Sequence, residues 1–199
     1  MIGKITGFLR EKSAPLCLVE VQGIAYELFA PMTTFYELPP IDETVSLFTH
    51  LVVREDAQTL YGFYTRQART LFRLLIKTNG VGPKLALTIL SGMSPDEFVQ
   101  HSRQGDTAAL LAIPGIGKKT AERLVIETRD VLKDWSAGTA NTSLAPSSGV
   151  VQDAISALTS LGYKLPQAKG VVEAVHQAGQ TSEALIRLAL QSLSKGARV

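Results

Sequence analysis

The chain is poor in the residues that usually build disulfide frameworks and metal centres. Its 199 residues include one cysteine, Cys17, and three histidines, His50, His101 and His176. A single cysteine excludes an intrachain disulfide, and Cys17 lies in an apolar run typical of a buried strand. The histidines are scattered, without a cysteine or paired carboxylate at ligand spacing, so we expect neither a metal nor another cofactor.

Long apolar runs and a strong net charge are also missing. The formal net charge is +2, and charged residues make up 19% of the chain and hydrophobic residues 45%, which is typical of a globular protein. No run approaches the ~20 apolar residues of a membrane span, and Met1–Lys4 lacks the features of a signal peptide. We expect a cytoplasmic protein without membrane contact. Any DNA contact must come from local binding motifs rather than from a protein surface that is positively charged throughout.

Two nucleotide-binding signatures fail as well. A phosphate loop requires G-x-x-x-x-G-K-[ST]. Counting back from Gly117, the first glycine position holds Ala112, and the residue after Lys118 is Lys119. The pattern G-x-G-x-x-G fails because Thr120 stands at its third glycine position. We therefore expect no nucleotide binding by this chain.

The chain does contain one motif twice. Apolar helical runs flank both Asn79–Lys84 and Ile113–Thr120, and each segment carries Gly-x-Gly with lysine close behind. The expected structure of each is a helix, a tight turn and a second helix. The candidate DNA-binding residues are Asn79, Gly80, Val81, Gly82 and Lys84 in the first turn and Gly115, Ile116, Gly117, Lys118, Lys119 and Thr120 in the second.

These turns favour phosphate binding. Glycines allow positive φ and remove side chains, so backbone N–H groups can approach an anion closely. The helix that follows adds unpaired N–H groups and the positive end of its dipole. Lysines in a first helical turn are unfavourable for the helix itself, which is understandable if an anion is normally bound there. The alternative is a helical hairpin whose glycines serve only a tight turn.

Residues 1–64 predict short strands. Apolar runs on either side of Gln22-Gly23 indicate a hairpin. A half-buried strand is indicated by the alternate positions Val45, Leu47, Thr49, Leu51 and Val53. Five short strands in this length suit a small closed barrel, and we expect most of its aromatic side chains to point inward. A longer connection between two strands is indicated by Pro31, Pro39 and Pro40. Arg54–Ala57 is expected to be an exposed hairpin tip carrying the acidic pair Glu55 and Asp56.

The period becomes helical from Thr65. Ser94 begins a capping box with proline at the next position, Asp106 is a candidate helix cap, and a helix is expected from Lys118 to about Lys133. Small and polar residues then indicate a flexible linker. The expected divisions are a barrel over residues 1–64, a helical domain over 65–134, a linker over 135–149 and three further helices over 150–199.

This order of parts resembles the RuvA family. The resemblance rests on Met1–Gly7, on Val52–Ala57 and Leu60–Phe63, on the paired hairpins, and on the linker with its three-helix tail. It implies a multidomain β plus α protein. The three parts would be an N-terminal OB-fold β-barrel, a central all-α double helix-hairpin-helix domain and a C-terminal three-helix, UBA-like domain.

The resemblance also implies a function. Members of this family form a homotetramer that holds four-way (Holliday) junction DNA open, and two stacked tetramers forming an octamer remain an alternative. The two Gly-x-Gly turns would hold the backbone of each arm, and Glu55 and Asp56 would be the acidic pin at the crossover. The implied partners are the RuvB hexameric ATPase, which drives branch migration, and the RuvC resolvase. The chain itself would be non-catalytic. We expect its RuvB contact patch at Leu158, Leu161, Gly162 and Tyr163, although the same residues could simply be the core of the small domain.

Two other functions must be weighed. A base-excision glycosylase also uses such a hairpin, followed by a catalytic aspartate for which Asp130 or Asp134 could be nominated. However, the helical domain is too short to hold a flipped base. A single-strand-binding OB protein would need exposed aromatic residues along a basic groove, which disagrees with aromatic side chains that point inward.

Overall fold

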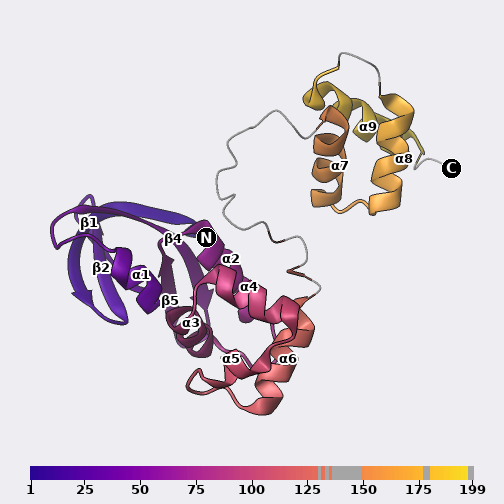
Figure 1. The fold of residues 1–199 in the computed structure, drawn as a ribbon. Helices are drawn as coiled ribbons and strands as arrows, with labels where there is room; N and C mark the ends of the chain where they lie inside the picture. The colour runs from indigo at the N-terminus through magenta and orange to yellow at the C-terminus, as the bar shows by residue number, and fades with distance from the viewer. Residues whose placement is uncertain (130, 133–134, 136–148, 177–179, 197–199) are drawn as a thin grey trace. The chain divides into compact units, whose positions relative to one another are not determined.

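The computed structural model describes the chain except for residues 130, 133–134, 136–148, 177–179 and 197–199. The chain divides into two compact units, Met1–Ala140 and Asn141–Val199. The first contains the strands and the helices α1 to α6, and the second contains α7 to α9 (Figure 1). Most of the predicted linker, together with Asp130 and Asp134, lies outside the described residues.

The N-terminal part is a closed five-stranded barrel with the order β1-β2-β3-β5-β4. All neighbours are antiparallel except β3 and β5, which are parallel at Phe29 and Tyr61. The β2–β3 turn has positive φ at both Gln22 (50°) and Gly23 (85°), as a two-residue hairpin loop requires. The OB-fold prediction is therefore confirmed. The strands are β1 (Lys4–Ser13), β2 (Leu16–Val21), β3 (Ile24–Phe29), β4 (Thr44–Val53) and β5 (Gln58–Phe63).

The barrel interior is aliphatic, so the expectation that its aromatic residues point inward is wrong. Its buried core includes Leu9, Val19, Leu28 and Leu47, each 0% exposed. On the strands Phe63 is the fully buried ring, whereas Phe8 is 49% exposed. Strand alternation says which residues share a face but not which face is inside, because apolar residues occupy both faces here. The objection to single-strand binding, which depended on inward-pointing aromatic rings, therefore no longer holds.

The connection between β3 and β4 contains a short helix, α1 (Met32–Glu37), that the proline spacing did not predict. Pro31 precedes its first turn, where the missing N–H group of proline is harmless. Two hydrogen bonds join it to helix α3 (Pro83–Gly92): Thr33 Oγ1 donates to the Leu90 carbonyl at 2.7 Å, and the Met32 N–H donates to Ser91 Oγ at 2.9 Å. Tertiary contacts therefore stabilise a helix too short to form alone.

The helical part begins where Thr65 caps α2 by accepting the N–H of Ala68. Ser94 makes both bonds of the predicted capping box with Glu97. Asp106 caps α5, as predicted. The helix from Lys118 ends at Arg129, earlier than expected. The remaining helices of this part are α2 (Arg66–Leu75), α4 (Pro95–Gln104), α5 (Thr107–Leu111) and α6 (Lys118–Arg129).

Trp135 belongs to the helical part rather than to the linker in which we expected it. Its side chain packs against the helical core, and its Nε1 donates to Asp96 Oδ1 at 3.3 Å. Arg103 of α4 donates to the Trp135 carbonyl at 2.9 Å and to the Leu132 carbonyl at 2.7 Å. The chain is thus held to α4 at the point where it leaves this part.

An aromatic cluster joins the barrel to the helices. Phe72 of α2 is 0% exposed, and its ring lies 4.9 Å from the rings of both Tyr61 and Phe63 and 5.8 Å from His50. Phe63 belongs to the same buried cluster as the helical core. Because strands β4 and β5 supply three of these rings, the barrel and the hairpin helices share one packed interface.

The described residues of the second unit form three helices, α7 (Val150–Ser160), α8 (Leu165–Val175) and α9 (Ser182–Gly196). Gly162, with φ of 97°, ends the turn after α7, and Thr181 caps α9 by accepting the N–H of Ala184. Its buried core consists of Ala154, Ile155, Leu158, Ala168, Val172, Leu185 and Ala189. The predicted helical tail is therefore confirmed.

Candidate nucleic-acid interface

The two Gly-x-Gly segments have the same backbone geometry. In the first, the N–H of Val81 donates to the Thr78 carbonyl at 3.1 Å; in the second, the N–H of Ile116 donates to the Ile113 carbonyl at 3.2 Å. Gly80 has φ of 85° and Gly115 has φ of 88°. Helix α3 starts at Pro83 and α6 at Lys118, immediately after the second glycine of each turn.

Only one glycine of each turn is needed by the fold. Gly80 and Gly115 have positive φ, which side chains other than glycine adopt at a cost of about 1–2 kcal/mol. Gly82 has φ of −85°, in the extended region, and a Cβ at Gly82 or Gly117 would meet nothing within 4 Å. The fold therefore leaves the backbone of these two glycines open to close approach by an external group.

The central side chain of each turn is buried in the helical core and is not available to contact a ligand. Val81 is 5% exposed and Ile116 is 7% exposed, and both pack in the helical core. Their N–H groups are used within the turns. The available donors are therefore those of the first turns of α3 and α6, whose N–H groups have no intrahelical partner. Lys84, Lys118 and Lys119 are exposed beside them.

Arg123 of α6 links the two hairpins and was missed by the sequence analysis. Its Nη1 donates to the carbonyl of Asn79 at 3.2 Å, so the helix after the second turn holds the first turn. In return, a Cβ at Gly115 would lie 3.5 Å from Leu85 Cδ1 of α3. Local periodicity places Arg123 only on a helix surface, so this contact could not be found from the sequence.

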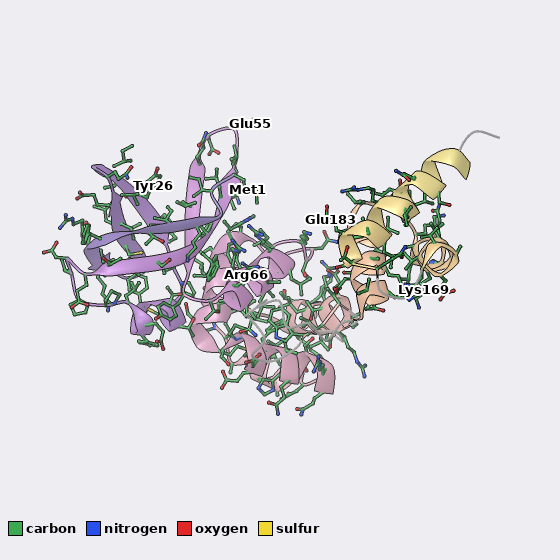
Figure 2. All side chains as sticks on the ribbon, turned by 90° about the horizontal axis from the view of Figure 1, so that it is seen from above. Met1, Tyr26, Glu55, Arg66, Lys169 and Glu183 are labelled. Carbon is green, nitrogen blue, oxygen red and sulfur yellow. The ribbon has the colours of Figure 1, made fainter. Side chains whose placement is uncertain are left out.

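The acidic pair lies at the end of a projecting hairpin. Strand β4 pairs with β1 through Thr44–Phe48, and the Thr49 N–H donates to the Gly3 carbonyl at 3.1 Å. Its last four residues, 50–53, then pair with β5 alone. The Arg54 N–H closes the tip by donating to the Ala57 carbonyl at 2.8 Å. Figure 2 shows Glu55 at the far end of this arm, and Glu55 and Asp56 are both exposed. The first unit therefore carries two glycine turns with exposed lysines beside them and one exposed acidic tip.

Comparison with known proteins gives the same order of parts. Residues 1–62 match the RuvA N terminal domain, residues 72–130 match the SAM-like helix-hairpin-helix tandem, and residues 149–194 match the RuvA C-terminal domain. The Holliday junction branch migration complex subunit RuvA of Idiomarina loihiensis is 57% identical over 205 residues, which cover 98% of this chain and 100% of the relative. The chain belongs to the RuvA family.

Relatives with the same name in two Shewanella species are similar to this chain to the same extent. The protein of Shewanella denitrificans is 54% identical over 202 residues and that of Shewanella frigidimarina is 56% identical over 204 residues. Each alignment covers 97% of this chain and 100% of the relative. The similarity to the RuvA family therefore extends through all three parts of the chain rather than through the helix-hairpin-helix region alone.

The small C-terminal domain of this RuvA family member separates the four residues that we expected to form one patch. Leu158 is 0% exposed and lies in the core of the domain, which corrects its placement on a contact surface. Leu161 is 63% exposed and Gly162 is exposed beside it. Tyr163 is partly buried against the core. The surface candidates are therefore Leu161, Gly162 and the outer edge of Tyr163.

Among the described residues, no group of histidine, cysteine, aspartate or glutamate side chains could hold a metal ion. In the same part of the chain, no helix combines the length and the apolar character needed to cross a membrane.

The contacts of Asp106 predict that the stability of the second hairpin depends on pH. Its Oδ1 accepts the N–H of Ala108 at 2.9 Å, and its Oδ2 lies 3.0 Å from His101 Nδ1. The hydrogen bond from Ala108, followed by that from His101, lowers the pKa of Asp106 below its usual value. Since the folded-state pKa is depressed, the resulting stability is present above about pH 4, the usual aspartate pKa, and is lost as the pH falls further.

We therefore expect Asp106→Asn, which keeps a capping side chain, to weaken the acid destabilisation of the helical part as the pH falls below about 4. The measurement is the urea midpoint followed by the fluorescence of Trp135, which is the only tryptophan of the chain and packs on this core. Asp153, on α7 of the other unit, provides a control variant, Asp153→Asn. Equal acid sensitivity in all three proteins would show that the Asp106 cap does not contribute.

Proposed function

We propose that this chain is a DNA-binding subunit that recognises four-way (Holliday) junctions by their shape and supports branch migration during recombination and repair. The observation that carries the proposal is the pair of glycines, Gly82 and Gly117, that the fold does not require. Each precedes a helix N-terminus with exposed lysines beside it. Contacts of this kind to phosphate would give binding with little sequence preference and strong salt dependence.

The projecting acidic tip supports recognition of a junction rather than of plain duplex. A carboxylate pair repels the backbone of DNA, so Glu55 and Asp56 would oppose binding to a continuous duplex that crosses the tip. At a crossover, four such tips would keep the strands apart and direct them into separate arms. The shared interface around Phe72 holds the tip and the turns within one packed unit.

The assembly that we propose is the one that the family resemblance implies. We propose a homotetramer, in which eight modest turn sites act together through avidity, with a face-to-face octamer as a second arrangement on DNA. The motor would be the RuvB hexameric ATPase, bound through Leu161, Gly162 and Tyr163, and RuvC resolvase would act on the same junction. The chain would itself be non-catalytic and cytoplasmic. Its functional divisions would be residues 1–64, 65–134 and 150–199, with a linker that begins after Trp135.

The proposal predicts preferential binding to a junction in a gel-shift experiment. An immobile four-way junction, a linear duplex with the same arm sequence and a poly-dT strand would be compared at moderate salt with excess competitor DNA. We expect discrete complexes with the junction under conditions where binding to the duplex is lost. The double variant Lys84→Ala, Lys118→Ala should bind more weakly and lower the dependence of log affinity on log salt by about 0.9 for each phosphate contact removed.

The single strand is included because the barrel exposes aromatic rings, among them Phe8, Tyr36 and Tyr64. These rings lie on β1, on α1 and just after β5, and base stacking on such rings would give an ordinary OB-fold binder. Equal affinity for junction and duplex would reject the junction function. Tighter binding to poly-dT than to the junction would favour the single-strand alternative.

A further inference from the structure

Three cationic side chains surround one aromatic ring where the barrel meets helix α2. The guanidinium carbons of Arg66 and Arg69 lie 5.7 Å and 5.3 Å from the centre of the Phe48 ring, and Lys4 Nζ lies 5.5 Å from it. Arg66 and Arg69 occupy neighbouring positions on one face of α2, and Lys4 faces Phe48 across the β1–β4 ladder. We call these three cations with Arg73 the basic seam.

Neutral groups hold the two inner arginines in place. Arg69 Nη1 donates to the Gly3 carbonyl at 2.6 Å, and Arg73 Nε donates to His50 Nδ1 at 3.1 Å. Burial first, and then the charges of Arg73 and Arg69, lower the pKa of His50, which favours the neutral ring that can accept this bond. Among the described residues, no carboxylate forms an ion pair with any member of the basic seam. The positive charge is therefore positioned but not neutralised.

The barrel contains a second arginine–phenylalanine pair that shows the contrast. The Arg10 guanidinium lies 5.3 Å from the centre of the Phe8 ring, but it also forms ion pairs with Glu20 at 2.8 Å and with Asp42. That site is electrically satisfied within the chain. In the basic seam the like charges crowd one another instead: burial, then Arg73 and Arg66, lower the pKa of Arg69. Binding of an anion would relieve this repulsion.

The position of the seam indicates which anion would bind there. Helix α2 runs from Arg66 to Leu75 and leads within a few residues to the first Gly-x-Gly turn. Strand β4 carries Phe48 and His50 and then continues directly into the arm that ends at Glu55 and Asp56. On this arrangement we expect a DNA strand that is turned away by the acidic tip and held at Gly82 to pass near the cations of the seam.

We propose that Lys4, Arg66, Arg69 and Arg73 form a further phosphate-binding surface, which holds the backbone of a junction strand between the acidic tip and the first hairpin. This inference rests on the proposed function. Arg69 is preorganised for phosphate, because its guanidinium lies over the Phe48 ring and is held by the Gly3 carbonyl, so little side-chain freedom remains to be lost on binding. The seam would attract the strand that the tip repels.

The test measures junction affinity over a series of salt concentrations with the full chain. The double variant Lys4→Gln, Arg66→Gln removes the two exposed cations and leaves the braced pair, Arg69 and Arg73, in place. We expect about tenfold weaker junction binding at moderate salt and a salt slope lower by about 0.9 for each phosphate that is no longer neutralised. The matched control is Arg10→Gln, which removes the neutralised arginine of the other pair and should leave both quantities unchanged.

The outcomes separate this inference from the proposed function. An unchanged salt slope in the seam variant, with junction preference intact, overturns the seam and leaves the function standing. If wild-type protein shows no junction preference, the function fails, and the seam is then judged by the slope on linear duplex. The alternative ligand of the seam is an acidic segment of a second copy of the chain. Sedimentation of the DNA-free proteins tests for it by measuring the size of the assembly. A smaller assembly for the seam variant would show that the cations bind an acidic segment of a second copy, and the phosphate site would be rejected.

Discussion

Aspartate in place of Gly82 and Gly117 should leave the protein as stable as before, or slightly more stable, while junction binding falls more than tenfold. Each glycine immediately precedes a helix, at a position where aspartate caps better than glycine and also favours the helix dipole. The space around both is open, since an added Cβ would meet nothing within 4 Å. Folding therefore tolerates the change, but a phosphate at the same N–H groups would meet a carboxylate.

The weaker binding follows from the hydrogen bonds to phosphate that the variant cannot make. One hydrogen bond to a charged group contributes about 1.5 kcal/mol or more, which corresponds to about tenfold in affinity, and the new negative charge adds repulsion. Gly82→Ser with Gly117→Ser provides the neutral comparison, because serine also caps but carries no charge. We expect it to bind between the wild type and the aspartate variant.

Gly80 provides a control variant that should lose stability, whereas the aspartate variant should keep it. Its φ of 85° is strained for alanine, so Gly80→Ala should lower the free energy of unfolding by about 1–2 kcal/mol. Stability would be measured by urea unfolding with Trp135 fluorescence, and affinity by the junction gel shift. If the aspartate variant binds junction as the wild type does, the turns serve only the fold. If the aspartate variant unfolds, the fold itself requires glycine at positions 82 and 117.

The sequence was most informative where local chemistry determines structure. Positive φ at Gly80 and Gly115 and the capping box at Ser94 act within a few residues, and all were expected from residue types alone. The repetition of the Gly-x-Gly turn also located the candidate site, because two copies of one turn are difficult to explain by the fold alone.

Features that depend on tertiary contacts could not be found in this way. Helix α1 is held by Leu90 and Ser91 of a distant helix, and Arg123 reaches Asn79 across the hairpin pair. The inward orientation expected for the barrel aromatic residues failed because both faces of its strands carry apolar side chains. Leu158 was assigned to a surface, although helical periodicity equally allowed the core that it occupies.

Replacement of Phe72 by alanine should have the largest effect on stability, lowering the free energy of unfolding of the first unit by about 3–5 kcal/mol. The ring is 0% exposed and contacts Tyr61, Phe63 and His50 of the barrel. Its loss also removes the centre of the interface between barrel and helices. We therefore expect the two halves to unfold separately, and the preference for junction over duplex to decrease, since the tip is no longer fixed relative to the turns.

The chain supplies one probe in each half. Cys17 lies buried in the barrel, where burial raises the pKa of its thiol to about 11, so its reaction with a thiol reagent reports opening of the barrel. Trp135 reports the helical core. In wild-type protein the two probes should give coincident urea transitions, whereas in Phe72→Ala they should separate. Phe98→Ala is the matched control, because Phe98 is equally buried but lies on α4.

The control distinguishes a loss of coupling from a loss of stability. Phe98→Ala should destabilise the helical core by a similar amount while leaving the Phe72 interface with the barrel in place. If both variants separate the two transitions equally, any weakening of the core uncouples the halves, and Phe72 has no special role. If only Phe72→Ala separates them and reduces junction preference at a temperature where both variants remain folded, then the recognition of a crossover depends on a rigid connection between the acidic tip and the phosphate-binding turns.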